Sequence, residues 1–218
     1  MMKLKAALFD LDGVVFDTEP QYSGFWGAEM RRYFPDKEGL ENAIKGQTLT
    51  QIMEAFFADD KQAQVDIVRR LDEFEHDMVF TYIAGFCPFI EDLRQHGVKT
   101  ALVTSSNGMK MASVYRSRPE VKDFFDRILT AESFTESKPS PECYLKGAAL
   151  LGCHPMECVG FEDSFNGLKS VSSSGMYVVG LSTTNPKESI FPYCQMVIED
   201  YLGLDYESLV NAIYPIDH

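Results

Sequence analysis

The sequence contains no long hydrophobic run and no excess of positive charge. No stretch reaches the ~18 consecutive apolar residues that a membrane-spanning helix requires, and the first apolar stretch, broken at Asp10, is too short for a signal peptide. The net charge is −13, from 33 acidic residues against 20 Lys and Arg. Such a charge repels nucleic-acid phosphates and anionic membrane surfaces. We therefore expect a cytoplasmic protein that binds neither nucleic acid nor membrane.

The cysteines lack a pairing pattern. Their number is odd and no CxxC pair occurs, which argues against a disulfide framework and against a zinc site; they are Cys87, Cys143, Cys153, Cys158 and Cys194. The sequence also shows no internal repeat and no low-complexity linker. With 45% hydrophobic and 24% charged residues, the 218-residue chain has an ordinary globular composition and room for one core plus a modest second unit.

What the sequence does contain is a series of short, mostly apolar runs followed by helical patterns. Runs of this length, each ended by polar residues or glycine, are typical of buried strands in a parallel sheet with crossover helices. The runs are Ala6–Phe9, Thr100–Val103, Arg127–Leu129, Cys158–Phe161, Tyr177–Val179 and Met196–Ile198. They predict an α/β fold with a Rossmann-like parallel sheet, and the pattern over Tyr206–Tyr214 predicts a closing helix.

The first two runs are about ninety residues apart, too far for a single crossover. Two apolar stripes at helical spacing fill this gap: Leu49, Ile52, Met53, Phe56 and Phe57, then Ile67, Leu71, Phe74, Met78 and Tyr82. The sequence thus predicts an inserted helical cap over residues 17–83 and a discontinuous core of residues 1–16 and 84–218. We expect hinges near residues 14–18 and 82–88, where Gly85 and Pro88 mark the return to the core.

Carboxylates follow two of the predicted strands. Asp10 and Asp12, with Gly13, end the first strand, and Glu162 and Asp163 end another. In an open parallel sheet the carboxyl ends of the strands border the ligand crevice, although Asp-Gly alone also occurs in ordinary capping loops. Four converging carboxylates could not all ionise without a cation, and hard oxygen ligands point to magnesium.

Two further segments predict phosphate chemistry at the same edge of the sheet. The hydroxyl of Thr104 and the backbone N–H groups that follow it could cradle a phosphate, although a plain helix cap is the stronger interpretation of this segment alone. Lys138 precedes Pro139, which keeps it extended. A lysine held there would neutralise the carboxylates and an incoming phosphate, and we expect it to be the only basic side chain beside them. Taken alone, a Lys-Pro pair is more often a surface loop.

In this order, the segments resemble the haloacid dehalogenase superfamily, in particular its beta-phosphoglucomutase-like group with a helical cap. The resemblance covers nearly the whole chain: Asp-x-Asp-Gly-Val-x-x-Asp-Thr from Asp10, Lys45-Gly46, the Thr104 segment, Lys-Pro-x-Pro-Glu from Lys138, and Glu-Asp-Ser-x-x-Gly from Glu162. It implies that Asp10 is the nucleophile and a magnesium ligand. It implies that Asp12 is the general acid/base and binds magnesium through its carbonyl. Thr104 and Lys138 would bind the phosphoryl group, and Glu162 and Asp163 would complete the magnesium site.

The resemblance also implies substrate-binding residues, with departures that bear on the substrate. The implied residues are Tyr22, Lys45, Gly46 and Thr48 in the cap and Ser105, Ser106 and Asn107 beside the phosphoryl group. Sugar phosphate mutases of this group carry His, Arg and Lys where this chain has Tyr22, Leu49 and Asn107. Those basic groups hold the second phosphate of a bisphosphate. A mutase is therefore less favoured than a phosphatase.

We accordingly expect a monomeric, magnesium-dependent phosphatase that acts on a small phosphorylated metabolite, such as a sugar phosphate, through an aspartyl-phosphate intermediate. A sugar phosphate mutase of the beta-phosphoglucomutase type is the alternative, because both reactions share the first half-reaction. A non-catalytic binding protein on the same fold is disfavoured, since every residue that the chemistry requires is present.

Overall fold

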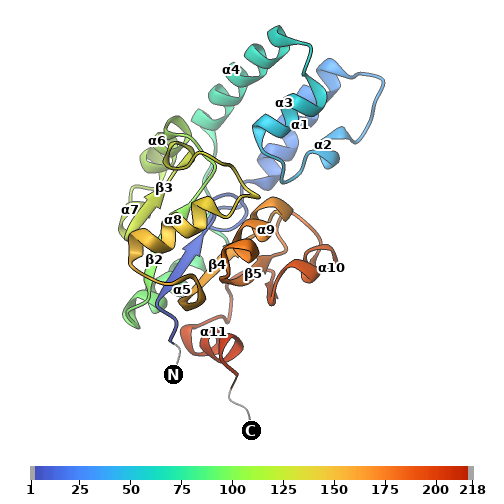
Figure 1. The fold of residues 1–218 in the computed structure, drawn as a ribbon. Coiled ribbons are helices and arrows are strands. Elements are labelled where there is room, and N and C mark those ends of the chain that lie inside the picture. Colours follow the sequence, from blue (N-terminus) through green and yellow to red (C-terminus); the bar gives the residue numbers. More distant parts are fainter. Residues whose placement is uncertain (1–2, 216–218) are drawn as a thin grey trace.

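A computed structural model describes residues 3–215, and its centre is a six-stranded parallel sheet (Figure 1). The spatial order is β3-β2-β1-β4-β5-β6, with β1 next to both β2 and β4. The strands are β1 (Ala6–Phe9), β2 (Lys99–Val103), β3 (Arg127–Leu129), β4 (Cys158–Glu162), β5 (Tyr177–Leu181) and β6 (Met196–Ile198). All six predicted strands are confirmed, with ends that shift by no more than two residues.

Helices cover both faces of the sheet because successive residues of its central strands point to opposite sides. Ala7 and Phe9 of β1 join one apolar cluster, and Ala6 and Leu8 join the other. The first cluster is covered by α5 (Phe86–Gln95), α6 (Gly108–Ser117), α7 (Val121–Phe124) and α11 (Tyr206–Ile213), and the second by α8 (Glu142–Leu151), α9 (Phe165–Ser174) and α10 (Lys187–Ile190). Three short 3₁₀ turns complete the core: η1 (Ala131–Ser133), η2 (Pro155–Glu157) and η3 (Phe191–Tyr193).

Four helices lie between β1 and α5, and we call this group of helices the cap. They are α1 (Glu19–Tyr33), α2 (Leu40–Ala43), α3 (Leu49–Phe56) and α4 (Lys61–Asp77). The cap has its own apolar cluster, which includes Trp26, Met30, Ile52 and Ile67. In Figure 1 the cap stands at one end of the molecule and the two termini lie at the opposite end.

The second predicted helical stripe continues past the true end of α4. The stripe included Tyr82, but α4 ends at Asp77, and Met78 has the extended dihedral angles φ −58° and ψ 146°. Tyr82 instead forms an antiparallel bridge with Phe16, so the chain leaves and re-enters the core side by side. Tyr82 fits the apolar spacing of the stripe, but its ring packs on Phe16 and Phe86, which belong to the core. Within residues 3–215, no helix is long and apolar enough to cross a membrane.

Candidate active site

The loops after the strands and the cap enclose one cavity of about 420 Å³. Asp10 and Asp12 follow β1, Thr104 follows β2, and Asp163 follows β4. The cap contributes residues of all four of its helices and of the segment between α2 and α3. The parallel sheet therefore brings the sequence motifs to one edge, as the strand-end argument predicts.

Three carboxylates converge at the bottom of this cavity. Asp10, Glu162 and Asp163 each offer an oxygen atom within 4.8 Å of the others. Burial, together with the neighbouring carboxylate Glu162, raises the pKa of Asp10 to about 7 against the opposing charge of Lys138. Burial and the charges of Glu162 and Asp10 also raise the pKa of Asp163 well above its ordinary value. A divalent cation would relieve this repulsion, and the oxygen donors suit magnesium.

Lys138 lies among these carboxylates. Its Nζ donates to Asp10 Oδ1 at 2.8 Å, to Glu162 Oε1 at 2.5 Å and to the carbonyl oxygen of Val103 at 3.1 Å. Burial alone would lower the pKa of Lys138, but the carboxylates of Asp10 and Glu162 more than offset it and raise that pKa. The lysine is therefore a fixed positive charge beside the proposed nucleophile.

Glu162 is completely buried and its oxygens have several protein donors. Besides Lys138, Oε1 accepts from the hydroxyl of Tyr144 at 2.8 Å, and Oε2 accepts from the backbone N–H of Asp163 at 3.3 Å. Gly167 of α9 lies so close that a Cβ there would come within 1.9 Å of the Glu162 carboxylate. The glycine of the Glu-Asp-Ser-x-x-Gly motif thus makes room for this side chain.

Asp163 is held by the segment that follows β5, which sequence reasoning missed. The hydroxyl of Thr184 donates to Asp163 Oδ2, and the amide of Asn185 donates to the Asp163 carbonyl oxygen at 3.1 Å. Thr183 donates to the carbonyl oxygen of Gly13 at 2.6 Å, which ties this segment to the first motif. Three hydrogen-bonding residues a few positions after the predicted strand indicate a polar loop, but they do not identify Asp163 as its partner.

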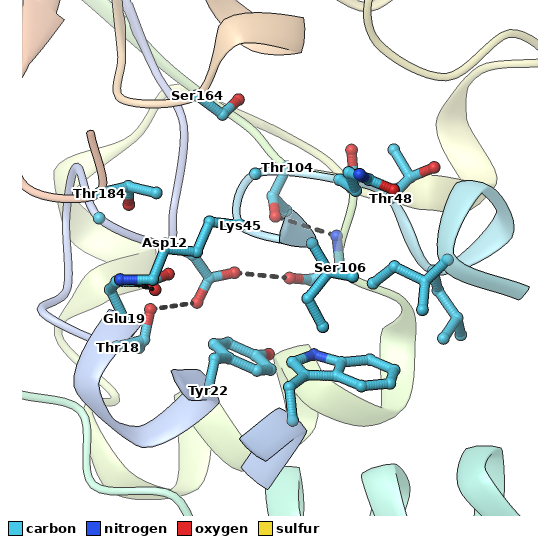
Figure 2. A pocket seen from close by; sticks show the side chains of 18 of the residues that line it. Asp12, Thr18, Glu19, Tyr22, Lys45, Thr48, Thr104, Ser106, Ser164 and Thr184 are labelled. Atoms are coloured by element: carbon cyan, nitrogen blue, oxygen red, sulfur yellow. Dashed lines mark hydrogen bonds and ion pairs between the residues drawn. The ribbon is translucent and has the colours of Figure 1, made fainter. Parts of the chain in front are cut away.

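Asp12 does not join the other carboxylates, so the predicted convergence of four is wrong for its side chain. Figure 2 shows the carboxylate between Thr18 and Ser106, which donate to Oδ1 at 2.7 Å and to Oδ2 at 3.4 Å. The Nζ of Lys110 on α6 also contacts Oδ2. Lys138 is therefore not the only basic side chain beside the four carboxylates, contrary to the expectation from the sequence. Lys110 escaped prediction because a lysine in the first turn of a helix is usually exposed.

The segment after β2 combines a buried hydroxyl with a helix cap. Thr104 is 1% exposed, and its Oγ1 accepts from the backbone N–H of Ser106 at 3.0 Å (Figure 2). Ser105 is exposed and lines the cavity. The Oδ1 of Asn107 accepts from the N–H of Lys110 at 2.9 Å, so this side chain caps α6. The phosphate contacts of Thr104, Ser105, Ser106 and Asn107 stay predictions.

The predicted substrate-binding residues of the cap all line the cavity, and three of them bond to neighbouring residues of the cap. Lys45 Nζ lies 3.4 Å from Glu19 Oε1, and Thr48 forms a capping box with Gln51 at the start of α3. The hydroxyl of Tyr22 donates to Glu75 on α4 at 2.6 Å. Substrate contacts by Tyr22, Lys45 and Thr48 also stay predictions.

Gly46 lies where the cap meets the core. Its φ is +69°, and a Cβ there would be 3.1 Å from the Cβ of Ser164. Its carbonyl oxygen accepts from the Asn166 amide at 3.3 Å, and the same amide donates to Gln51 at 2.9 Å. This seam between the cap and the start of α9 closes one side of the cavity.

Comparison with known proteins gives a consistent result. The family profile of haloacid dehalogenase-like hydrolases matches residues 7–181. Hexitol phosphatase A of Escherichia coli is 30% identical over 188 residues, which cover 83% of this chain and 84% of the relative. Beta-phosphoglucomutase of Bacillus subtilis is 24% identical over 197 residues, 84% of this chain and 85% of the relative. A crystal structure of a HAD hydrolase, family IA, variant 3, from Entamoeba histolytica superimposes with a TM-score of 0.84 at 21% identity and covers 96% of this chain and 99% of that one.

The resemblance inferred from the motifs is thus confirmed at the level of the family. The relatives include phosphatases and a phosphomutase, and the chain is accordingly a phosphohydrolase or phosphotransferase. With a profile match over most of its length and the matching fold, this chain belongs to the haloacid dehalogenase-like hydrolase family.

Proposed function

We propose that this enzyme is a magnesium-dependent phosphatase that hydrolyses a small phosphate monoester through a phosphorylated Asp10. The convergence of Asp10, Glu162 and Asp163 supports the metal requirement, because these three carboxylates lie together while Lys138, which pairs with Asp10 and Glu162, supplies a single positive charge. Asp10, Asp163 and the backbone carbonyl of Asp12 would hold the ion, with Glu162 bound directly or through water. The bound ion would neutralise charge on the phosphoryl oxygens.

The residues of the chain divide the reaction into two steps. In the first, a carboxylate oxygen of Asp10 attacks phosphorus, the ester P–O bond breaks, and Asp12 gives its proton to the departing oxygen. In the second, Asp12 takes a proton from water, the water oxygen attacks phosphorus, and the P–O bond to Asp10 breaks. Thr104 and the N–H groups beside it would bind the phosphoryl oxygens, and Lys138 would offset their charge.

Hydrolysis rather than mutase activity is supported by the charges that line the cavity. Its three lysines each contact a carboxylate: Lys45 lies beside Glu19, Lys110 beside Asp12, and Lys138 beside Asp10 and Glu162. Within residues 3–215, no arginine lines the cavity. Its cap side carries four carboxylates, on Glu19, Glu41, Asp72 and Glu75. This wall would repel a second phosphate, and this is the observation that carries the assignment.

Water must reach the phosphorylated Asp10 only after the leaving group departs, which a moving cap would achieve. We propose a core of residues 1–16 and 84–218 and a cap of residues 17–83 that hinge where the two connections run together. There the N–H of Asp17 donates to the Thr81 carbonyl at 2.8 Å, and the N–H of Ile83 donates to the Val15 carbonyl at 3.0 Å. Paired connections of this kind allow rotation about one line.

A substrate screen tests the proposal. The purified enzyme is incubated with hexitol, sugar and other small phosphate monoesters, with and without magnesium, while free phosphate is measured. The names of the relatives put sugar and polyol phosphates first in that screen. We expect phosphate release that stops in excess chelator. Release that continues without metal would contradict the magnesium assignment, and no release from any ester would contradict the phosphatase.

Beta-phosphoglucomutase activity is the second candidate, because that relative matches over most of its length and Lys45-Gly46 is present. The discriminating assay uses beta-glucose 1-phosphate with and without glucose 1,6-bisphosphate. Glucose 6-phosphate and free phosphate are followed together. Rapid formation of glucose 6-phosphate with little free phosphate would make the enzyme a mutase.

A further inference from the structure

Lys110 is a buried lysine in the cavity that the reaction scheme above does not use. The residue is 3% exposed, its Nζ contacts Asp12 Oδ2, and the same Nζ lies 4.8 Å from the centre of the Tyr22 ring. A buried ammonium is costly unless it has partners. Its partners here include the side chain assigned as general acid/base and an aromatic ring of the cap.

The local structure fixes the position of this lysine. Asn107 caps α6 by accepting from the N–H of Lys110, so the lysine stands in the first turn of the helix that follows the Thr104 segment. Above it, the hydroxyl of Tyr22 donates to Glu75 at 2.6 Å, which holds the ring that the ammonium faces. The cap helix α4, which carries Glu75, packs directly against α6. Lys110 therefore joins the core to two cap helices at Asp12.

The two carboxylate oxygens of Asp12 are held by different residues. The side chain of Asp12 is more exposed than that of Lys110, at 30% against 3%. One oxygen is held by Thr18 at the root of the cap, and the other by Lys110 and, at a longer 3.4 Å, by Ser106. Without Lys110, the second oxygen would keep only the long contact to Ser106.

We propose that Lys110 is a positioning residue that holds the Asp12 carboxyl group toward the leaving-group oxygen of the substrate. This inference rests on the proposed function, since it concerns the step in which Asp12 protonates that oxygen. General acid/base catalysis depends on placing the group within hydrogen-bond reach, and a displacement of about 1 Å can cost roughly 10²-fold. A positioning role also explains why a lysine lies in the cavity yet is unavailable to a second phosphate.

The proposal predicts a dependence on the leaving group. Alkyl phosphates, such as a sugar or polyol phosphate, need a proton on the departing oxygen, whereas p-nitrophenyl phosphate releases a stabilised anion without one. Lys110→Met keeps the aliphatic stem and removes the ammonium. We expect it to slow single-turnover release of the alkyl leaving group by about 10- to 100-fold, and that of p-nitrophenolate by less than about threefold.

A double-mutant cycle with Asp12→Ala then tests whether Lys110 acts through Asp12. In the Asp12→Ala background, Lys110→Met should change alkyl leaving-group release by less than about threefold. Equal losses on both substrates, or the full loss persisting without Asp12, would overturn the proposal. The outcome is separate from the proposed function, because the wild-type substrate screen tests hydrolysis whatever Lys110 does.

Two more variants keep the test decisive. Lys122→Met is the matched control, since Lys122 also lies over a tyrosine ring, 4.3 Å from the centre of Tyr115, and neither residue lines the cavity. It should leave the leaving-group dependence unchanged. Lys110→Gln retains an N–H donor toward Asp12 and should lose less than Lys110→Met. Melting temperatures identify any variant that fails to fold, and Lys110→Gln then supplies the same substrate comparison.

Discussion

The core side of the cavity, which we call the floor, and its cap side, which we call the roof, use their polar side chains differently. On the floor, Lys138, Glu162 and Asp163 are almost fully buried; Lys138 and Asp163 line the cavity, and Glu162 lies behind them against Lys138. In the roof, Thr48 caps a helix and the side chain of Lys45 is 31% exposed beside Glu19. The floor thus has a fixed electrostatic arrangement suited to one chemistry, whereas the roof is built mainly to shape and close the space above it.

This difference bears on how specificity arises. Under the proposed mechanism, the same floor would serve a phosphatase or a mutase, because both reactions would begin by phosphorylating Asp10. The choice of acceptor and substrate then depends on what the roof admits, and here the roof presents carboxylates such as Asp72 and Glu75. The predictions below begin with substitutions and metal removal at the floor. They continue with the seam between the two regions and end with the charge of the roof.

The largest effect is expected from Asp10→Asn. A neutral amide cannot attack phosphorus, so turnover should fall by on the order of 10⁴-fold or more. Phosphate release is measured against the wild type, with circular dichroism as the control for folding. A folded variant that retains more than a trace of activity would remove Asp10 from the role of nucleophile.

Metal binding at the floor should show a defined pH dependence. The pKa of Asp10 is raised by burial to about 7 and that of Asp163 is raised as well. A carboxyl group with a raised pKa contributes stability that is fully present below its unfolded-state pKa and is lost as pH rises through its folded-state pKa. The metal-free protein should therefore lose stability between about pH 5 and pH 8, and magnesium should restore it most at the upper end.

Melting temperatures with magnesium or with chelator, taken across that range, check this expectation. Asp163→Ala is the companion variant, and both its activity and its magnesium-dependent stabilisation should be weaker than in the wild type. A stabilisation by magnesium that is the same at both ends of the range would contradict the coupling between metal and carboxylates.

The sequence predicts the carboxylates of the floor but not the residues that hold them in place. The reason is how far apart the bonded residues lie in the chain. Asp10, Asp12, Glu162 and Asp163 could be placed because each directly follows a recognisable strand, and all six strands were recognised. Thr184 and Lys110 could not, because their partners Asp163 and Asp12 are 21 and 98 residues away in the chain. Nothing in the local pattern of a Thr after a strand, or of a Lys on a helix, identifies such a partner.

The roof was the less predictable region for a related reason. Two of its four helices, α3 and α4, follow from apolar spacing, but the chain beyond Asp77 leaves the helix and Tyr82 bridges Phe16, which is a tertiary contact. Likewise, Thr48 was predicted as a substrate contact, and the structure shows its side chain capping α3, as Asn107 caps α6 in the core. Short polar side chains at helix starts fit either role until a fold is known.

The seam between roof and floor can be tested with matched glycine variants. Gly46 and Gly97 have φ values of +69° and +75°, so alanine at either should cost stability by about 1 kcal/mol. A Cβ at Gly46 would also press on Ser164, whereas a Cβ at Gly97 meets nothing within 4 Å. Only Gly46→Ala should raise KM, by several-fold, since it alone disturbs closure. Similar KM values for the two variants would show that this seam does not affect substrate binding.

The smallest effect, and the most informative about the roof, is expected from Leu49→Arg. Leu49 lines the cavity at the start of α3, where a mutase would carry an arginine for the second phosphate. An added guanidinium should attract a bisphosphate against the acidic wall, and a charged hydrogen bond of about 1.5 kcal/mol corresponds to roughly tenfold tighter binding. Glucose 1,6-bisphosphate should therefore inhibit monoester hydrolysis at lower concentration in Leu49→Arg than in the wild type. Leu49→Gln, of similar polarity but without charge, is the control and should show little of this gain. If both variants bind the bisphosphate equally, or neither binds it better than the wild type, the charge of the roof does not decide between one phosphate and two.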